Sequence, residues 1–127
     1  MQTLILVSHS AKITEGIKEL ITEMVPDADN TFEVIAAGGT EDGEIGTSPM
    51  PIVDGIQNAK GDHVYIFTDM GSAVLSSETA IDFLTDEQKK KVTLLESPIV
   101  ESAYIAAIQS TIGASHDDLL KAIEEQA

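Results

Sequence analysis

The sequence predicts an α/β fold, a three-layer sandwich in which a mainly parallel sheet of about four strands has helices on both faces. Short apolar runs alternate four times with segments of helical periodicity, a pattern typical of parallel sheets covered by helices. Right-handed crossovers place every strand-to-helix loop at one edge of such a sheet. We expect the strand order 2-1-3-4 and a single domain over residues 1–127.

The first unit is a strand at residues 3–8 followed by a helix at residues 11–25. The strand contains four consecutive apolar residues, and the helix carries apolar residues at spacings of three and four. Ser8 or Ser10 is the expected N-cap, because a hydroxyl can accept a hydrogen bond from the first free amides of a helix. The second strand is expected at residues 32–36.

A glycine-rich loop at residues 37–48 separates the second strand from a short helix. It holds four glycines in twelve positions, which excludes a regular element and allows close approach of another group. Thr47 or Ser48 is the expected cap of the helix, with Pro49 near its first turn. The third strand is expected at residues 62–68.

The last part of the chain repeats the alternation of strand and helix. A helix is expected at about residues 72–84 and the fourth strand at residues 92–95. A further helix begins after Pro98 and ends at Gly113, and Ser115 caps a final helix.

The charge balance restricts the binding partners. The chain has 22 acidic residues against seven lysines and no arginine, for a formal charge of −15. Nucleic acid and anionic membrane surfaces are therefore not expected as partners, and a basic protein face is favoured. There is no cysteine, which excludes disulfides and thiolate chemistry. We find neither a signal peptide nor a membrane span, and expect a cytoplasmic protein.

His9 and Asp69 follow two different strands, at what should be the same edge of the sheet. A carboxylate that accepts from Nδ1–H fixes the tautomer of a histidine and leaves a lone pair on Nε2. Such an imidazole can act as a base, a metal ligand or a nucleophile. The alternative is a structural histidine and an aspartate that caps a helix. His63 and His116 lack metal-ligand spacing to His9, and we expect them to be structural or surface residues.

Four segments resemble one family in order along the chain. They are Leu6-Val7-Ser8-His9-Ser10, Ala37-Gly38-Gly39-Thr40, Thr68-Asp69-Met70-Gly71-Ser72-Ala73 and Ser97-Pro98-Ile99-Val100-Glu101. Together they resemble the mannose-type enzyme IIA superfamily of the PEP-dependent phosphotransferase system. Within it, they are most similar to the phosphotransferase subunit of the dihydroxyacetone kinase system.

This resemblance implies a phosphoryl carrier. His9 would accept a phosphoryl group from the phosphocarrier HPr and pass it to ADP bound in the nucleotide-binding subunit of the kinase. Asp69 would orient His9. The residues expected to hold the phosphoryl oxygens are Gly38, Gly39, Thr40 and Ser72. No metal or cofactor is expected, a homodimer is implied, and the HPr-like and enzyme I-like domains that some relatives carry would be separate proteins.

Three other functions remain open on the sequence. The first is a mannose-type enzyme IIA for sugar transport, with the same chemistry and another acceptor. The second is a metal-binding α/β protein of the chelatase kind, whose first strand also ends in histidine. The third is an interaction domain in which His9 is structural.

Overall fold

The structure is a computed structural model that describes residues 1–127, and it confirms the predicted fold class. The elements in chain order are β1 (Gln2–Val7), α1 (Ala11–Met24), β2 (Phe32–Ala36), α2 (Pro49–Asn58), β3 (His63–Thr68), α3 (Gly71–Asp82), α4 (Asp86–Lys89), β4 (Val92–Leu95), α5 (Ile99–Thr111) and α6 (His116–Gln126). All strand pairs are parallel and the order is β2-β1-β3-β4, as predicted.

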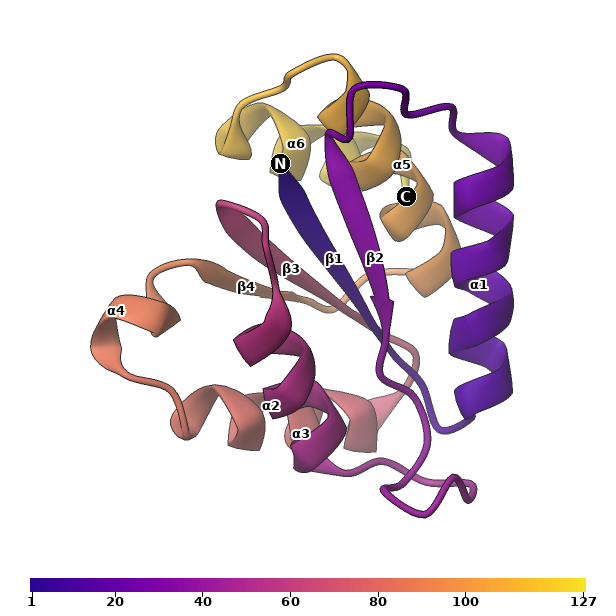
Figure 1. Cartoon of the computed structure of the whole chain (residues 1–127), viewed down its shortest axis with the longest axis vertical. Helices are drawn as coiled ribbons and strands as arrows, with labels where there is room; N and C mark the ends of the chain where they lie inside the picture. The colour runs from indigo at the N-terminus through magenta and orange to yellow at the C-terminus, as the bar shows by residue number, and fades with distance from the viewer.

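Helices lie on both faces of the sheet (Figure 1), and a separate cluster of buried apolar residues lies on each face. Along β1, Leu4 and Leu6 point into the layer formed with α1, α5 and α6, whereas Ile5 and Val7 point into the layer formed with α2 and α3. Successive side chains of a strand point to opposite faces, so a strand buried on both faces consists of consecutive apolar residues. None of the helices combines the length and apolarity that crossing a membrane requires.

Helix α1 begins after Ser10, whose Oγ accepts a hydrogen bond from the amide of Ile13 at 3.3 Å. Ser10 is therefore the N-cap, and Ser8 is fully buried and bonded elsewhere. Of the apolar residues at helical spacing in α1, Ile17 and Ile21 are buried. Periodicity thus predicted the helix, but only this pair packs in the core.

The short helix α4 was not predicted. Thr85 caps it in a capping box with Gln88, in which each side chain bonds to the backbone amide of the other residue. Four residues are too few to show helical periodicity, so only the spacing of Thr85 and Gln88 signals this helix in the sequence.

Two histidines pack together at the amino ends of the strands, far from His9 in the sheet. The rings of His63 on β3 and His116 on α6 have centroids 4.3 Å apart. His63 Nε2 lies 2.7 Å from Thr93 Oγ1, and His116 Nδ1 lies 2.7 Å from the hydroxyl of Tyr65. These contacts attach α6 to the sheet, in agreement with the expected structural role.

We predict that this contact makes stability depend on pH. Burial, and secondly the charge of His116, lower the pKa of His63 below its ordinary value of 6.5. The unfolded chain then binds more protons than the folded chain below about pH 6.5, so the free energy of unfolding should decrease as the pH falls through this range. Urea denaturation at about pH 7.5 and about pH 5.5 measures the decrease. The decrease should be smaller in His63→Gln, and an equal decrease in both proteins would contradict the prediction.

Candidate active site around His9

His9 and Asp69 meet because β1 and β3 are neighbours in the sheet. Val7 pairs with Thr68 at the ends of these strands, so the loops that follow lie side by side at the carboxyl edge (Figure 1). His9 Nδ1 lies 3.1 Å from Oδ1 of Asp69, and the backbone amide of His9 donates to Oδ2 at 3.1 Å. The carboxylate therefore holds both the ring and the backbone of His9.

Asp69 is kept ionised by the donors around it. Ser8 Oγ donates to Oδ2 at 2.9 Å, and the amide of Met70 donates to Oδ1 at 2.7 Å. Burial by itself raises the pKa of Asp69, but these bonds and those from His9 outweigh burial and hold the pKa below its usual value. The sequence reasoning did not assign Ser8 to the site, because a buried hydroxyl inside an apolar strand end carries no distinctive pattern.

The other ring nitrogen of His9 faces Ser72. An ionised carboxylate can only accept, so Nδ1 carries the proton and Nε2 presents a lone pair. The hydroxyl of Ser72, in the first turn of α3, forms a hydrogen bond with this nitrogen. The side chain of His9 is 27% exposed. A reactant from solvent can therefore reach Nε2 when the Ser72 hydroxyl moves aside.

Two helices begin beside His9. Helix α1 follows it directly, and α3 carries Ser72. The backbone N–H groups of Ala11 and Lys12 in α1, and of Gly71 and Ser72 in α3, have no acceptor in the protein. Free amides at helix starts carry partial positive charge, so a doubly charged group on Nε2 would be favoured there without any arginine.

Three of the predicted site residues lie in the loop after β2, and their amides are already used. Gly38 N–H donates to Thr14 Oγ1 at 3.3 Å, Gly39 N–H to Ser8 O at 3.0 Å, and Thr40 N–H to Glu44 O at 3.0 Å. The structure thus brings Ser72 to His9 but turns these three amides toward the chain itself. A role for Gly38, Gly39 and Thr40 in holding the phosphoryl group stays a prediction.

The far end of the same loop reaches α3. The amide of Gly46 donates to His9 O at 2.8 Å. Ser48 stands at the N-cap of α2, but its hydroxyl donates to Glu41 at 2.8 Å and makes no cap bond. Thr47 does not cap α2 either, because its hydroxyl contacts Ser72 and Ser76 of α3. The expected side-chain cap of α2 was therefore wrong.

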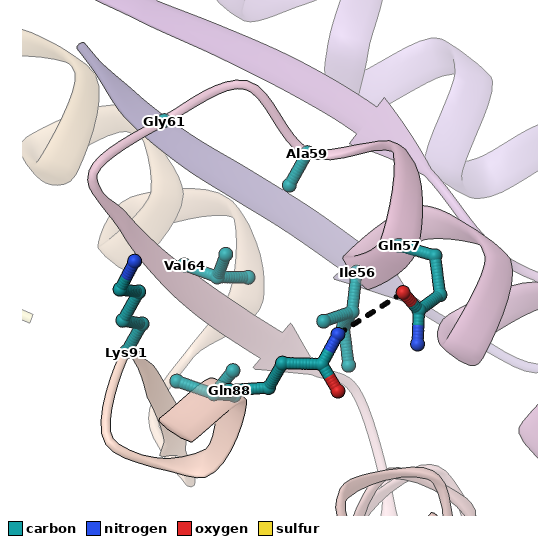
Figure 2. A pocket seen from close by; sticks show the side chains of 8 residues that line it. Ile56, Gln57, Ala59, Gly61, Val64, Gln88 and Lys91 are labelled. Atoms are coloured by element: carbon teal, nitrogen blue, oxygen red, sulfur yellow. Dashed lines mark hydrogen bonds between the residues drawn. The ribbon is translucent and has the colours of Figure 1, made fainter. Parts of the chain in front are cut away.

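A separate hollow lies at the opposite end of the sheet (Figure 2). The hollow lies between α2, α4 and the starts of β3 and β4. Val64 and Lys91 are among the residues that line it. Gln88 Nε2 donates to Gln57 Oε1 at 3.1 Å across its mouth, as the dashed line in Figure 2 shows. None of the predicted site residues lines this hollow. No group of three or more histidine, aspartate or glutamate side chains is arranged to hold a metal ion.

Comparison with known proteins assigns the family. The family model EIIA-man, described as the PTS system fructose IIA component, matches residues 3–120. The chain belongs to the EIIA-man family. The predicted resemblance to the mannose-type enzyme IIA superfamily is thereby confirmed.

Several relatives of this EIIA-man family member have names from the dihydroxyacetone kinase system. The PEP-dependent dihydroxyacetone kinase 2, phosphoryl donor subunit DhaM, of Listeria innocua is 46% identical over 122 residues, which cover 95% of each chain. The PTS-dependent dihydroxyacetone kinase, phosphotransferase subunit DhaM, of Lactococcus lactis is 32% identical, covering 96% of this chain and 93% of the relative. The Escherichia coli subunit is 36% identical, and the match covers 94% of this chain and 26% of that longer protein.

Two solved structures share the fold. The crystal structure of EF1359, a protein of unknown function, is 39% identical with a TM-score of 0.88, covering 99% of this chain and 95% of that one. The EIIA component from Streptococcus agalactiae is 19% identical with a TM-score of 0.69, covering 98% and 91%. The second likeness concerns the fold alone.

We predict that Gly38 is required for close packing of the loop on α1. A Cβ at Gly38 would lie 2.6 Å from Ser10 O and 2.7 Å from the side chain of Thr14. Gly38→Ala should therefore lower the free energy of unfolding by about 1–3 kcal/mol. Gly16→Ala is the matched control, because a Cβ there meets open space and should stabilise the helix by up to about 1 kcal/mol. Urea denaturation compares the two, and a Gly38→Ala protein as stable as wild type would contradict the prediction.

Proposed function

We propose that the chain is a phosphoryl carrier of a dihydroxyacetone kinase system. His9 accepts a phosphoryl group from phospho-HPr and passes it to ADP held by the nucleotide-binding subunit of the kinase. The observation that carries this proposal is the Nε2 lone pair of His9, oriented by Asp69 and directed at the start of α3. The names of the relatives that match along almost their whole length support the choice of kinase. Such a carrier would work in the cytoplasm.

The transfer step needs an oriented nucleophile and a group that balances the positive charge developing on the imidazole. The lone pair of Nε2 attacks phosphorus as the bond between phosphorus and the donor histidine breaks, and the donor nitrogen keeps the electron pair of that bond. Positive charge that develops on the ring of His9 is balanced by Asp69, 3.1 Å from Nδ1. Phosphoryl transfer depends mainly on positioning and electrostatic stabilisation, so the chain does not itself need an ATP site.

The phosphoryl oxygens would be held by neutral donors. The hydroxyl of Ser72 bonds to Nε2, and the free amides belong to the helix that follows His9 in the chain and to the helix that carries Ser72. Gly38, Gly39 and Thr40 would contribute by holding the loop in place, since their amides are engaged within the chain. A cradle built from amides and hydroxyls stabilises the phosphoryl group moderately, and a carrier must also release that group to the next acceptor.

The surface around His9 suits a protein partner. Ile45, Met70 and Leu75 are 78%, 61% and 65% exposed, and they come from the loop after β2 and from both sides of the start of α3. Exposed apolar side chains near a reactive group favour protein docking, and the formal charge of −15 favours a basic partner face. The implied homodimer is part of the proposal, and each copy would hold a complete site because His9, Asp69 and Ser72 lie on one chain.

A sugar-transport enzyme IIA is the second candidate function. The description of the matching family model as a fructose IIA component favours it, and the chemistry at His9 would be the same. The two functions differ in the acceptor alone. Transfer from the phosphorylated chain to the ADP-loaded kinase subunit, compared with transfer to a sugar-specific enzyme IIB, distinguishes them.

We predict that His9 is the single site of phosphorylation. Incubation with labelled PEP, enzyme I and HPr should give one acid-labile phosphoryl group per chain, and His9→Ala should carry none. His116→Gln is the matched control, because His116 bonds to Tyr65 at the far end of the sheet and this variant should be labelled as fast as wild type. Labelling of His9→Ala at the wild-type level would contradict the proposal.

We predict that Asp69→Asn slows phosphorylation of His9 by about 10- to 100-fold, the range seen when a partner that orients a functional histidine is lost. The amide retains the shape of the side chain but removes the negative charge that balances the imidazole. The initial rate of labelling by phospho-HPr at pH 7 measures the effect. Folding is checked by circular dichroism, and a folded Asp69→Asn protein with the wild-type rate would exclude the orienting role.

A further inference from the structure

We infer that Thr47 is a positioning residue for phosphoryl transfer, which together with Ser76 holds the hydroxyl of Ser72 as a hydrogen-bond donor toward Nε2 of His9. This inference rests on the proposed function. Thr47 lies in the loop after β2, whereas Ser72 and Ser76 are one turn apart on α3. It acts through Ser72 and does not itself touch the reacting nitrogen.

The contacts form one continuous series of polar groups. Thr47 Oγ1 lies 2.8 Å from Ser76 Oγ, 3.2 Å from Ser72 O and 3.3 Å from Ser72 Oγ. Ser72 Oγ bonds to His9 Nε2, and His9 Nδ1 bonds to Asp69. The series therefore runs from Ser76 through Thr47, Ser72 and His9 to Asp69.

The direction of each proton follows from the carboxylate at the end of the series. Asp69 can only accept, so Nδ1 donates to it and Nε2 has no proton. Nε2 then needs a donor, and the Ser72 hydroxyl supplies its one proton. The single proton of Thr47 Oγ1 has two acceptors within reach, Ser72 O at 3.2 Å and Ser72 Oγ at 3.3 Å. In the inferred series this proton goes to Ser72 Oγ, and Ser76 Oγ donates to Thr47 Oγ1. A series in which every bond points the same way is cooperative, because each bond polarises the next.

This arrangement suits both states of His9. Before transfer, the proton of Ser72 lies on the lone pair of Nε2. As the bond between Nε2 and phosphorus forms, the same hydroxyl can turn its proton to a phosphoryl oxygen while Thr47 keeps donating to Ser72. No proton leaves any hydroxyl in this step. Without Thr47, the Ser72 hydroxyl is free to point elsewhere and the preorganised donor is lost.

The backbone around Thr47 is held independently of its hydroxyl. Thr47 forms a parallel bridge with Gly39, and the amide of the preceding Gly46 donates to His9 O at 2.8 Å. Replacing the hydroxyl of Thr47 by a methyl group in Thr47→Val should therefore leave the loop in place. The neighbouring Ser48 donates to Glu41 outside this series, so Ser48→Ala is a matched control.

The test measures single-turnover phosphorylation of the full chain by phospho-HPr over a range of HPr concentrations. We expect Thr47→Val to lower the maximal rate by about three- to tenfold, the effect of one lost hydrogen bond, with the concentration for half-maximal rate unchanged. Thr47→Ser should restore the rate, Ser48→Ala should match wild type, and Ser76→Ala should show a smaller loss. The ¹⁵N chemical shift of His9 Nε2 should change in Thr47→Val, because this nitrogen loses its fixed hydrogen-bond donor, whereas Nδ1 should stay protonated against Asp69.

The outcomes separate the two proposals. A wild-type protein that is not labelled at His9 overturns the proposed function. Labelling at His9 together with a wild-type rate and a wild-type Nε2 chemical shift in Thr47→Val overturns the positioning role. A change that appears only in the HPr concentration for half-maximal rate overturns it as well. Should Thr47→Val fail to fold, Ser76→Ala decides: a wild-type maximal rate in that variant overturns the inference.

Discussion

The site depends on the parallel pairing of β1 with β3. This pairing sets Val7 beside Thr68 and so places the loop that carries His9 next to the loop that carries Asp69. The carboxylate then binds the backbone amide as well as the ring of His9, which fixes the position and the tautomer of the imidazole together. Ser8, buried at the end of β1, holds the carboxylate in turn. The chemistry at Nε2 follows from this set of contacts.

An acidic chain without arginine would have to meet a phosphoryl group without a guanidinium. In the proposed function, free amides at two helix starts and the hydroxyl of Ser72 take the place of cationic side chains. Partial charges at a helix start are worth less than a full opposite charge. Weak stabilisation agrees with the proposed relay, because the group must leave His9 for the next acceptor. The same acidic surface would attract basic partner faces. This attraction acts over about one Debye length, roughly 8 Å at physiological ionic strength.

The loop of residues 37–48 shows what the sequence could predict and what it could not. Its glycines predicted close approach to other groups, and Gly38 does lie against Ser10 and Thr14. The prediction that its first amides face a phosphoryl group finds no support in their hydrogen bonds, which end on the chain itself. The contact of Thr47 with Ser72 joins residues 25 apart. No local pattern marks such a pair, since hydroxyls near a helix start are equally typical of caps.

The sequence alone determined the fold class, the strand order and the convergence of His9 and Asp69 on one edge, whereas it left the cap of α1 open between Ser8 and Ser10. Apolar runs, helical spacing and crossover handedness are sufficient for these features, because they depend on local periodicity and general topology. Only the tertiary structure decided which hydroxyls face Nε2, which amides stay free, and which apolar residues of α1 are buried. These depend on the angles at which loops and helices pack, and side-chain contacts between distant segments are settled by that packing.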